Sequence, residues 1–236
     1  MGPGVTPPVR LYLGLVAFSL AGSGFSRATG LDPGPIAPVT AALTLGVGLW
    51  ASLGSWLTER TSRWGWLAGI ALFGAGSEIV GVLTGYPFGQ YVYTDRWWPT
   101  VPLSADSRFP LLLPFAWLLI AGSSWMASPG SGWRRVLFGA LLATLVDIVM
   151  EPTMAGPLGY WRWLEKGPLP GGAPLMNAVG WLVVSLSACA ALEISSRNRS
   201  LPHNPQPTTH NPQASARWVL AGQTALTLGL GLLLRG

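Results

Sequence analysis

The sequence has 236 residues, of which 50% are hydrophobic and only 10% are charged, and its mean hydropathy is +0.42. Soluble domains carry about 25% charged residues, so this composition excludes an ordinary soluble domain and indicates a membrane protein. The formal net charge of +5 comes mainly from arginines in short loops, without the basic and aromatic clusters of a nucleic-acid surface. We therefore expect contact with membrane lipid and no binding of nucleic acid.

Several apolar stretches are long enough to form membrane-spanning helices. They lie at about 10–26, 36–57, 64–84, 109–127, 133–151, 174–195 and 216–235. The sequence therefore predicts an all-α fold, a polytopic bundle of about seven helices that forms a single integral-membrane domain over residues 1–236. The first stretch lacks a convincing small-residue cleavage site, so we expect it to be a helix and not a cleaved signal peptide.

The connecting segments differ in length and composition. Residues 85–108 and 152–173 are long and rich in Trp, Tyr, Pro and Gly, which is typical of functional loops rather than disordered ones. Residues 196–216 are polar and predict a flexible loop. Eight Lys or Arg lie on the N-terminal side of the predicted helices and six on the other side. This bias predicts a multi-pass protein of the cell membrane with a cytoplasmic N-terminus and with the aromatic loops on the opposite face.

Acidic residues are rare within the predicted helices, and an ionisable group there is a candidate functional residue. Glu78 lies 15 residues after Arg63, roughly 22 Å along the helix. Asp147 lies 12 residues after Arg135, roughly 18 Å along its helix. Glu151 follows Asp147 at position i+4 and shares its helix face. The three carboxyl groups are therefore predicted at the end of the bundle that carries the aromatic loops.

Small residues accompany these acids and predict how the helices pack. Gly74 and Gly81 lie close to the acidic face of the third helix, and Ala140 and Ala143 lie on the acidic face of the fifth. Because small residues let helices approach closely in lipid, we expect the third and fifth helices to press these faces together. In contrast, Glu193 lies near the end of the sixth helix, and we expect it to be interfacial and solvated.

Further polar and aromatic residues fall at the same end. Asn177 and Trp181 are i, i+4 neighbours in the first turns of the sixth helix, and Pro114 and Trp117 begin the fourth. A single buried acid can be a hydrogen-bonded contact between helices and nothing more. Independent contacts of that kind have no reason to gather at one end, so the pattern favours a functional pocket.

Five stretches of the chain carry a resemblance to a known family. They are EIVGVLTGYPFGQYVY (78–93), the VP…LPFAW region (101–117), DIVMEP (147–152), GYWRW (159–163) and GGAPLMNAVGW (171–181). In combination they resemble the integral-membrane carotenoid-biosynthesis family of bacteria and archaea that includes the carotenoid 1,2-hydratases and bisanhydrobacterioruberin hydratase. The family pattern has an aspartate where this chain has Glu151, so the chain departs from it by one longer acid.

The resemblance implies a carotenoid 1,2-hydratase, a hydro-lyase that adds water to the terminal 1,2 double bond of a linear carotenoid ψ-end. Protonation of the less substituted carbon leaves a tertiary cation, which water captures. The donor must be a neutral carboxylic acid, a form that burial and neighbouring carboxyl groups favour. We predict that Asp147 protonates the alkene and that Glu78 or Glu151 positions the water and takes its proton. Asn177 is predicted to orient that water.

Aromatic side chains are candidates for substrate contact, because aromatic faces stabilise cations at short range. The predicted substrate-binding residues are Tyr91, Tyr93, Trp163, Trp181, Trp117 and Phe88. We expect Trp97, Trp98 and Trp161 to belong to an interfacial belt instead. The residues expected to make turns are Pro87, Gly89, Pro152 and Gly159.

The sequence predicts no metal or redox cofactor, and water is the co-substrate. His203 and His210 lie in the polar segment away from the acids, and no Cys/His spacing fits a zinc site. The single cysteine, Cys189, excludes an intrachain disulfide. The predicted partners are a linear carotenoid dissolved in the lipid, which enters through a lateral opening between two helices, and other enzymes of the carotenoid pathway.

Other functions remain open at this point. A carotenoid end-group cyclase begins with the same protonation, but an internal double bond captures the cation. A small membrane transporter also uses acids in helices broken by Gly and Pro, although this chain shows no internal repeat and its acids lie toward one face. A non-catalytic carotenoid-binding scaffold needs the apolar helix seam but not the acids.

Overall fold

The computed structural model describes residues 5–32, 36–197 and 211–234. The helices of these residues are α1 (Pro7–Thr29), α2 (Ile36–Thr58), α3 (Arg63–Thr84), α4 (Leu113–Ala127), α5 (Gly132–Met154), α6 (Leu175–Arg197) and α7 (Pro212–Leu234). In this described part of the chain, six helices are long and apolar enough to cross a membrane, and α4 is apolar but shorter. The prediction of an all-α, polytopic membrane bundle with seven helices is confirmed.

At the long loops the predicted end of α3 is confirmed, whereas the start of α4 and the end of α5 differ from the predicted ones. α3 ends at Thr84 and is capped by Gly85, which adopts the left-handed conformation with φ +79°. Gly85 donates its N–H to the Gly81 carbonyl at 2.7 Å, a common glycine helix end. α4 begins at Leu113 and not at residue 109. α5 continues to Met154 with Pro152 inside it, so the turn predicted at Pro152 is wrong.

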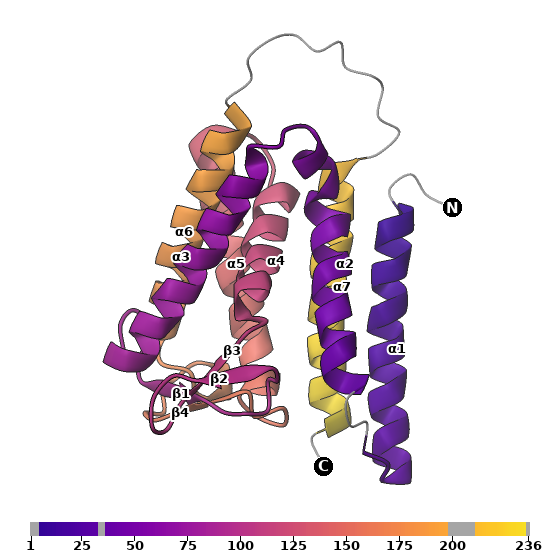
Figure 1. The fold of residues 1–236 in the computed structure, drawn as a ribbon, viewed down its shortest axis with the longest axis vertical. Helices are drawn as coiled ribbons and strands as arrows, with labels where there is room; N and C mark the ends of the chain where they lie inside the picture. Colours follow the sequence, from indigo (N-terminus) through magenta and orange to yellow (C-terminus); the bar gives the residue numbers. More distant parts are fainter. Residues whose placement is uncertain (1–4, 33–35, 198–210, 235–236) are drawn as a thin grey trace.

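α4 is the central helix of the bundle. It packs against α2, α3, α5, α6 and α7, and its residues from Trp117 to Ala127 are all buried. Figure 1 shows α1, α2 and α7 side by side on one flank and α3, α4, α5 and α6 on the other. A buried α4 therefore joins two groups of helices.

The predicted direct packing of the third and fifth helices is wrong within the described residues. α3 packs mainly against α4 and α6, whereas α5 packs against α4, α6 and α7. The small residue Gly74 of α3 faces α4, because a Cβ atom placed on it would lie 2.8 Å from the Trp117 ring. Small residues do permit close packing here, but the partner is an aromatic ring of the central helix.

The two long aromatic loops fold into one cap over the α3–α6 group. β1 (Tyr91–Tyr93) pairs antiparallel with β4 (Trp161–Trp163), so that Tyr91 lies opposite Trp163 and Tyr93 opposite Trp161. β2 (Thr100–Pro102) pairs antiparallel with β3 (Arg108–Pro110), and a short 3-10 helix, η1, covers Pro170–Gly172. Figure 1 shows both sheets lying across one end of these helices. Loops predicted as separate segments therefore form a joint structure.

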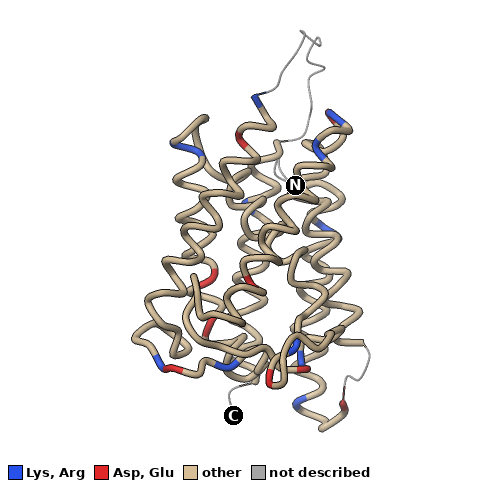
Figure 2. Tube along the Cα trace, turned by 60° about the vertical axis from the view of Figure 1, so that its left-hand side comes forward, with Lys and Arg blue, Asp and Glu red and all other residues tan. Residues whose placement is uncertain are grey.

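Charged residues are unevenly distributed along the bundle. Figure 2 shows Lys and Arg mainly near its two ends, with a few Asp and Glu positions on the helices between them. The N-terminal end of α1 and the α2–α3 and α4–α5 connections lie at the end opposite the cap. Residues 198–210 of the predicted polar loop, with His203 and His210, lie outside the described residues, while its flanks belong to α6 and α7.

Candidate active site

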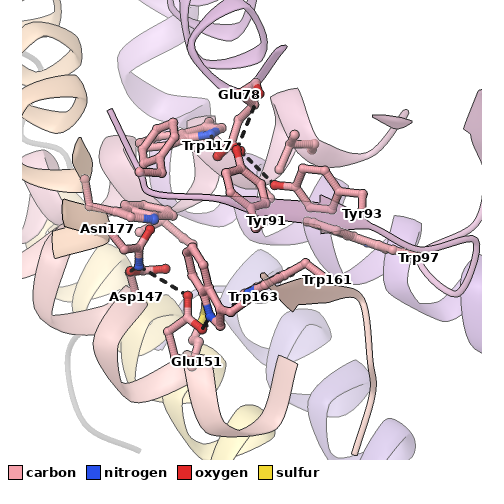
Figure 3. Close-up of a pocket in the computed structure, with 16 residues that line it drawn as sticks. Glu78, Tyr91, Tyr93, Trp97, Trp117, Asp147, Glu151, Trp161, Trp163 and Asn177 are labelled. Carbon is pink, nitrogen blue, oxygen red and sulfur yellow. Dashed lines mark hydrogen bonds between the residues drawn. The ribbon is translucent and has the colours of Figure 1, made fainter. Parts of the chain in front are cut away.

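A cavity lies between the cap and the adjacent ends of α3, α4, α5 and α6 (Figure 3). Its room for water-sized molecules amounts to about 50 Å³, which is enough for a few water molecules. Every side chain that the sequence predicts for the site lines this cavity. They are Glu78, Asp147, Glu151, Asn177, Tyr91, Tyr93, Trp163, Trp181, Trp117 and Phe88.

Glu78 projects into the cavity from the buried face of α3, with 4% of its surface exposed. Its Oε2 accepts hydrogen bonds from the hydroxyl groups of Tyr91 at 2.5 Å and Tyr93 at 2.9 Å. Its Oε1 accepts a hydrogen bond from the Trp117 indole N–H at 3.0 Å. Burial, and then the negative charge of Glu78, raise the pKa of both tyrosine hydroxyls well above its ordinary value. Both tyrosines therefore keep their protons and can donate.

Asp147 and Glu151 of α5 form a second acidic group in the cavity, and Asn177 of α6 bridges them. The Asn177 side-chain amide donates to Asp147 Oδ2 at 2.8 Å and to Glu151 Oε1 at 3.2 Å. Both acids are almost fully buried. The i, i+4 spacing places them on one helix face, and Figure 3 shows Glu78 apart from this pair. The three carboxyl groups that were predicted to lie together therefore line one cavity, but as two separate groups: Glu78 alone, and Asp147 with Glu151.

The β1–β4 sheet contacts one acid of each group, Glu78 and Glu151. Alternate residues of a strand point to the same side, so Tyr91 and Tyr93 of β1 both reach Glu78. In the same way, the indole N–H groups of Trp163 and Trp161 on β4 both donate to Glu151 Oε2, at 3.0 and 3.3 Å. The sheet thus holds a carboxyl group of α3 with one strand and a carboxyl group of α5 with the other.

Asp147 differs from the other two acids in its hydrogen bonding. Within the described residues, Glu78 and Glu151 each accept hydrogen bonds from three different side chains. Asp147 accepts a side-chain hydrogen bond only from Asn177 in the same part of the chain. It is the acid with the most free hydrogen-bonding capacity toward whatever occupies the cavity.

Aromatic rings form most of the cavity wall. Trp117 and Trp181 stack with ring centres 4.0 Å apart, and Tyr91 lies 5.3 Å from Trp163. Glycines allow this density, because a Cβ atom on Gly180 would lie 2.6 Å from the Phe88 ring. A cation formed in the cavity would therefore meet aromatic faces on several sides.

Two tryptophans that the sequence assigned to an interfacial belt line the cavity instead. Trp161 donates to Glu151, and Trp97 packs against Trp161 with ring centres 6.4 Å apart. Both therefore contribute to the cavity wall, whereas Trp98 is 60% exposed. The signal that was missed is the alternation in YVY (91–93) and WRW (161–163), which is typical of paired strands.

Glu193 shows that burial alone does not distinguish these acids. It lies near the opposite end of the bundle and is only 6% exposed, so its predicted solvated position is wrong. It accepts hydrogen bonds from the Gly132 backbone N–H at 2.5 Å and from the Trp125 indole at 3.2 Å. It also pairs with Arg197 at 3.4 Å.

The cavity acids have neither a cationic partner nor a metal-binding arrangement in the described residues. The ion pairs found there join Arg63 to Glu59 and Arg197 to Glu193, and both lie outside the cavity. No three His, Cys, Asp or Glu side chains of this part of the chain are grouped as ligands for a metal ion. Neutral Tyr, Trp and Asn donors surround the cavity acids instead.

Comparison with known proteins places these features in a family. The family described as carotenoid biosynthesis protein matches residues 37–235. A bisanhydrobacterioruberin hydratase of Haloarcula japonica is 31% identical over 124 residues, which cover 50% of this chain and 40% of that protein. No solved structure matches the chain. With most of its length matched, the chain belongs to the carotenoid biosynthesis protein family.

Proposed function

We propose that the protein is a carotenoid 1,2-hydratase that adds water to the terminal double bond of a linear carotenoid ψ-end. The observation that carries the proposal is the Asp147–Asn177–Glu151 group in a narrow, aromatic-walled cavity that also contains Glu78. The name of the Haloarcula relative supports a hydratase. A family of carotenoid biosynthesis proteins supports a carotenoid as substrate.

The proposed proton donor is Asp147. Glu151 is surrounded by N–H groups, and the Trp117 indole N–H lies beside Glu78. These groups can only donate hydrogen bonds, and donors directed at a carboxyl group stabilise its ionised form. Asp147 receives fewer of them and is the acid best suited to remain neutral. In the first step its O–H bond breaks, and the proton adds to the less substituted carbon of the terminal double bond. The π electrons form the new C–H bond and leave a tertiary cation.

The second step is capture of that cation by water. The water oxygen forms a bond to the tertiary carbon and loses a proton to Glu78 or Glu151, both of which line the cavity. Glu151 lies one helical turn from Asp147, so a proton that Glu151 accepts has a short path through water back to Asp147. Asn177 contacts both acids and is placed to orient the water. The net change is alkene plus water to tertiary alcohol, which requires no redox or metal cofactor.

Substrate entry is constrained by the narrow cavity. With room for only a few water molecules, it admits a branched hydrocarbon end only if aromatic side chains of the wall shift. The same rings then surround the cation, and we assign this role to Tyr91, Tyr93, Trp163 and Trp181. Their faces supply stabilisation that water would otherwise provide, while limiting how many water molecules compete for the site.

Expression in cells that make lycopene or another linear carotenoid tests the proposal. Pigments from these cells are compared by chromatography and mass spectrometry with those from cells expressing Asp147→Asn. A gain in mass of one water per processed end with the wild type only is the expected result. An isomer of unchanged mass would identify a cyclase. Unchanged pigments in cells whose membranes contain the protein would contradict an enzymatic role.

A further inference from the structure

A second hollow lies between α3 and α6, nearer the end of the bundle opposite the cap. We call it the α3–α6 groove. It has a volume of about 510 Å³, within the usual range of ligand pockets. The two helices pack against each other and lie side by side in Figure 1. The residues that define the groove here are Gly65, Gly69 and Phe73 of α3 and Ala188 and Ala191 of α6.

The groove is apolar and open. Among the described residues its lining contains no charged side chain, and its hydrogen-bonding side chains are two serines and the Trp66 indole. A Cβ atom placed on Gly65 or on Gly69 would have no atom within 4 Å. These helix positions therefore leave free space where most residues would place a side chain. Such a surface suits an extended hydrocarbon and offers no charge to a polar headgroup.

The groove and the catalytic cavity share two helices, α3 and α6. Ile70 of the groove lies eight residues before Glu78 on α3, which corresponds to about 12 Å along the helix. Ala188 of the groove lies 11 residues after Asn177 on α6, which corresponds to about 16 Å. Since α3 and α6 run in opposite directions, both distances point away from the cap. The groove thus lies farther from the cap than the cavity does, along the same pair of helices.

We propose that the α3–α6 groove binds the polyene chain of the carotenoid whose end group occupies the cavity. This inference rests on the proposed function and extends it to the remainder of the substrate. A linear carotenoid is rigid and extended, so a polyene that leaves the cavity between α3 and α6 would run along these helices toward the opposite membrane face. The hydrocarbon core is about 30 Å thick, and the groove lies within that span. Trp66 and Phe73 offer the polyene aromatic faces.

The Gly69→Trp variant tests the groove directly. The new side chain enters open space and should fill the groove without displacing helix packing. The control is Gly46→Trp on α2, another exposed glycine whose Cβ position has no atom within 4 Å. Both are compared with the wild type in cells that make a linear carotenoid, with conversion normalised to the amount of folded protein in the membrane. We expect Gly69→Trp to lower conversion on the order of tenfold, the effect of about 1.4 kcal/mol of lost binding, and Gly46→Trp to leave it unchanged.

A second readout does not depend on turnover. Asp147→Asn protein, with and without Gly69→Trp, is purified from the same cells, and bound carotenoid per protein is measured by its absorbance. Loss of pigment with Gly69→Trp, but not with Gly46→Trp, supports the inference even where no water is added. Equal pigment and equal conversion in the two Trp variants would overturn it and leave the proposed hydratase standing. Absence of hydration by the wild type, with pigment still lost in Gly69→Trp, would refute the hydratase and keep the groove as a carotenoid site.

Discussion

The two ends of the bundle both bury carboxyl groups, but they surround them with different partners. At the end away from the cap, Glu193 is paired with Arg197 and with a backbone N–H. The Arg135 guanidinium lies 3.9 Å from the centre of the neighbouring Trp125 ring. At the capped end, the side chains of the described residues that donate to the three cavity acids are all neutral Tyr, Trp and Asn. These carboxyl groups are therefore all buried, but of them only Glu193 has a cationic partner in the described part of the chain.

The arginine-rich end stabilises the central helix. Arg135 donates to the Trp125 carbonyl at 3.0 Å, and Arg217 donates to the Ala127 carbonyl at 3.3 Å. These carbonyl groups belong to the last turn of α4, where basic side chains interact favourably with the helix dipole. Charge is thus neutralised at this end, as expected of a structural site. An acid without a cation, in contrast, is free to exchange a proton, and the following variants test that distinction.

The largest expected effect is that of Asp147→Asn. The amide keeps the shape of the side chain but cannot deliver a proton, so hydration should fall by about 10²–10⁴-fold, the usual contribution of a general acid. Conversion of a linear carotenoid in cells, normalised to protein in the membrane, measures the loss. A variant that hydrates at the wild-type rate would remove Asp147 from the proposed chemistry.

The next effect separates the two candidate bases. Glu78→Gln and Glu151→Gln each keep the size of the side chain while removing its capacity to take up a proton. The variant that lacks the true base should lose on the order of 10²-fold in rate, and the other should lose less. Both are assayed with the same carotenoid and the same normalisation. Full activity in both variants would mean that neither carboxylate accepts the proton of water.

A smaller effect is expected at the β1–β4 sheet. Trp161→Phe and Trp163→Phe each remove one N–H donor to Glu151 but keep an aromatic ring in the wall. Hydrogen bonds to charged groups contribute about 1.5–3 kcal/mol, so a rate loss of roughly tenfold or more is expected if Glu151 must be held ionised. Trp98→Phe is the matched control, because Trp98 is 60% exposed. Equal rates for all three would assign both indoles to packing alone.

The smallest effect on activity is expected for Glu193→Gln. Loss of its charge weakens the contacts to Arg197 and Gly132 and should lower stability by about 1–3 kcal/mol. Hydration per folded molecule should not change. Thermal unfolding in detergent and pigment analysis measure the two quantities separately. A loss of turnover comparable to that of Asp147→Asn would erase the distinction between the two ends.

The helices and the acidic cavity could be predicted because their signals are local. Apolar length marks the spans, and the rise per residue places Glu78 and Asp147 near one end of the bundle. The i, i+4 rule puts Glu151 on the Asp147 face. These inferences need only a single helix at a time, and the structure places all three side chains around one cavity.

The errors concern contacts between distant segments. The pairing of β1 with β4 joins residues about 70 positions apart, so Trp161 looked like part of a surface belt until its strand was placed. Helix neighbours are also invisible in one sequence, and α3 therefore meets Trp117 of α4 where α5 was expected. Glu193 looked solvated because its partners Trp125 and Gly132 lie more than 60 residues away.

Hydration in heavy water tests the central claim most directly. If a carboxylic acid of the cavity protonates the alkene carbon and water captures the cation, each hydroxyl group formed in D₂O is accompanied by one deuterium bound to the adjacent carbon. After the exchangeable hydroxyl deuterium is washed out, mass spectrometry should still detect that carbon-bound label, and Asp147→Asn should form no labelled alcohol. A hydrated product without carbon-bound deuterium, or labelled alcohol formed at full rate by Asp147→Asn, would contradict acid-driven water addition at this site.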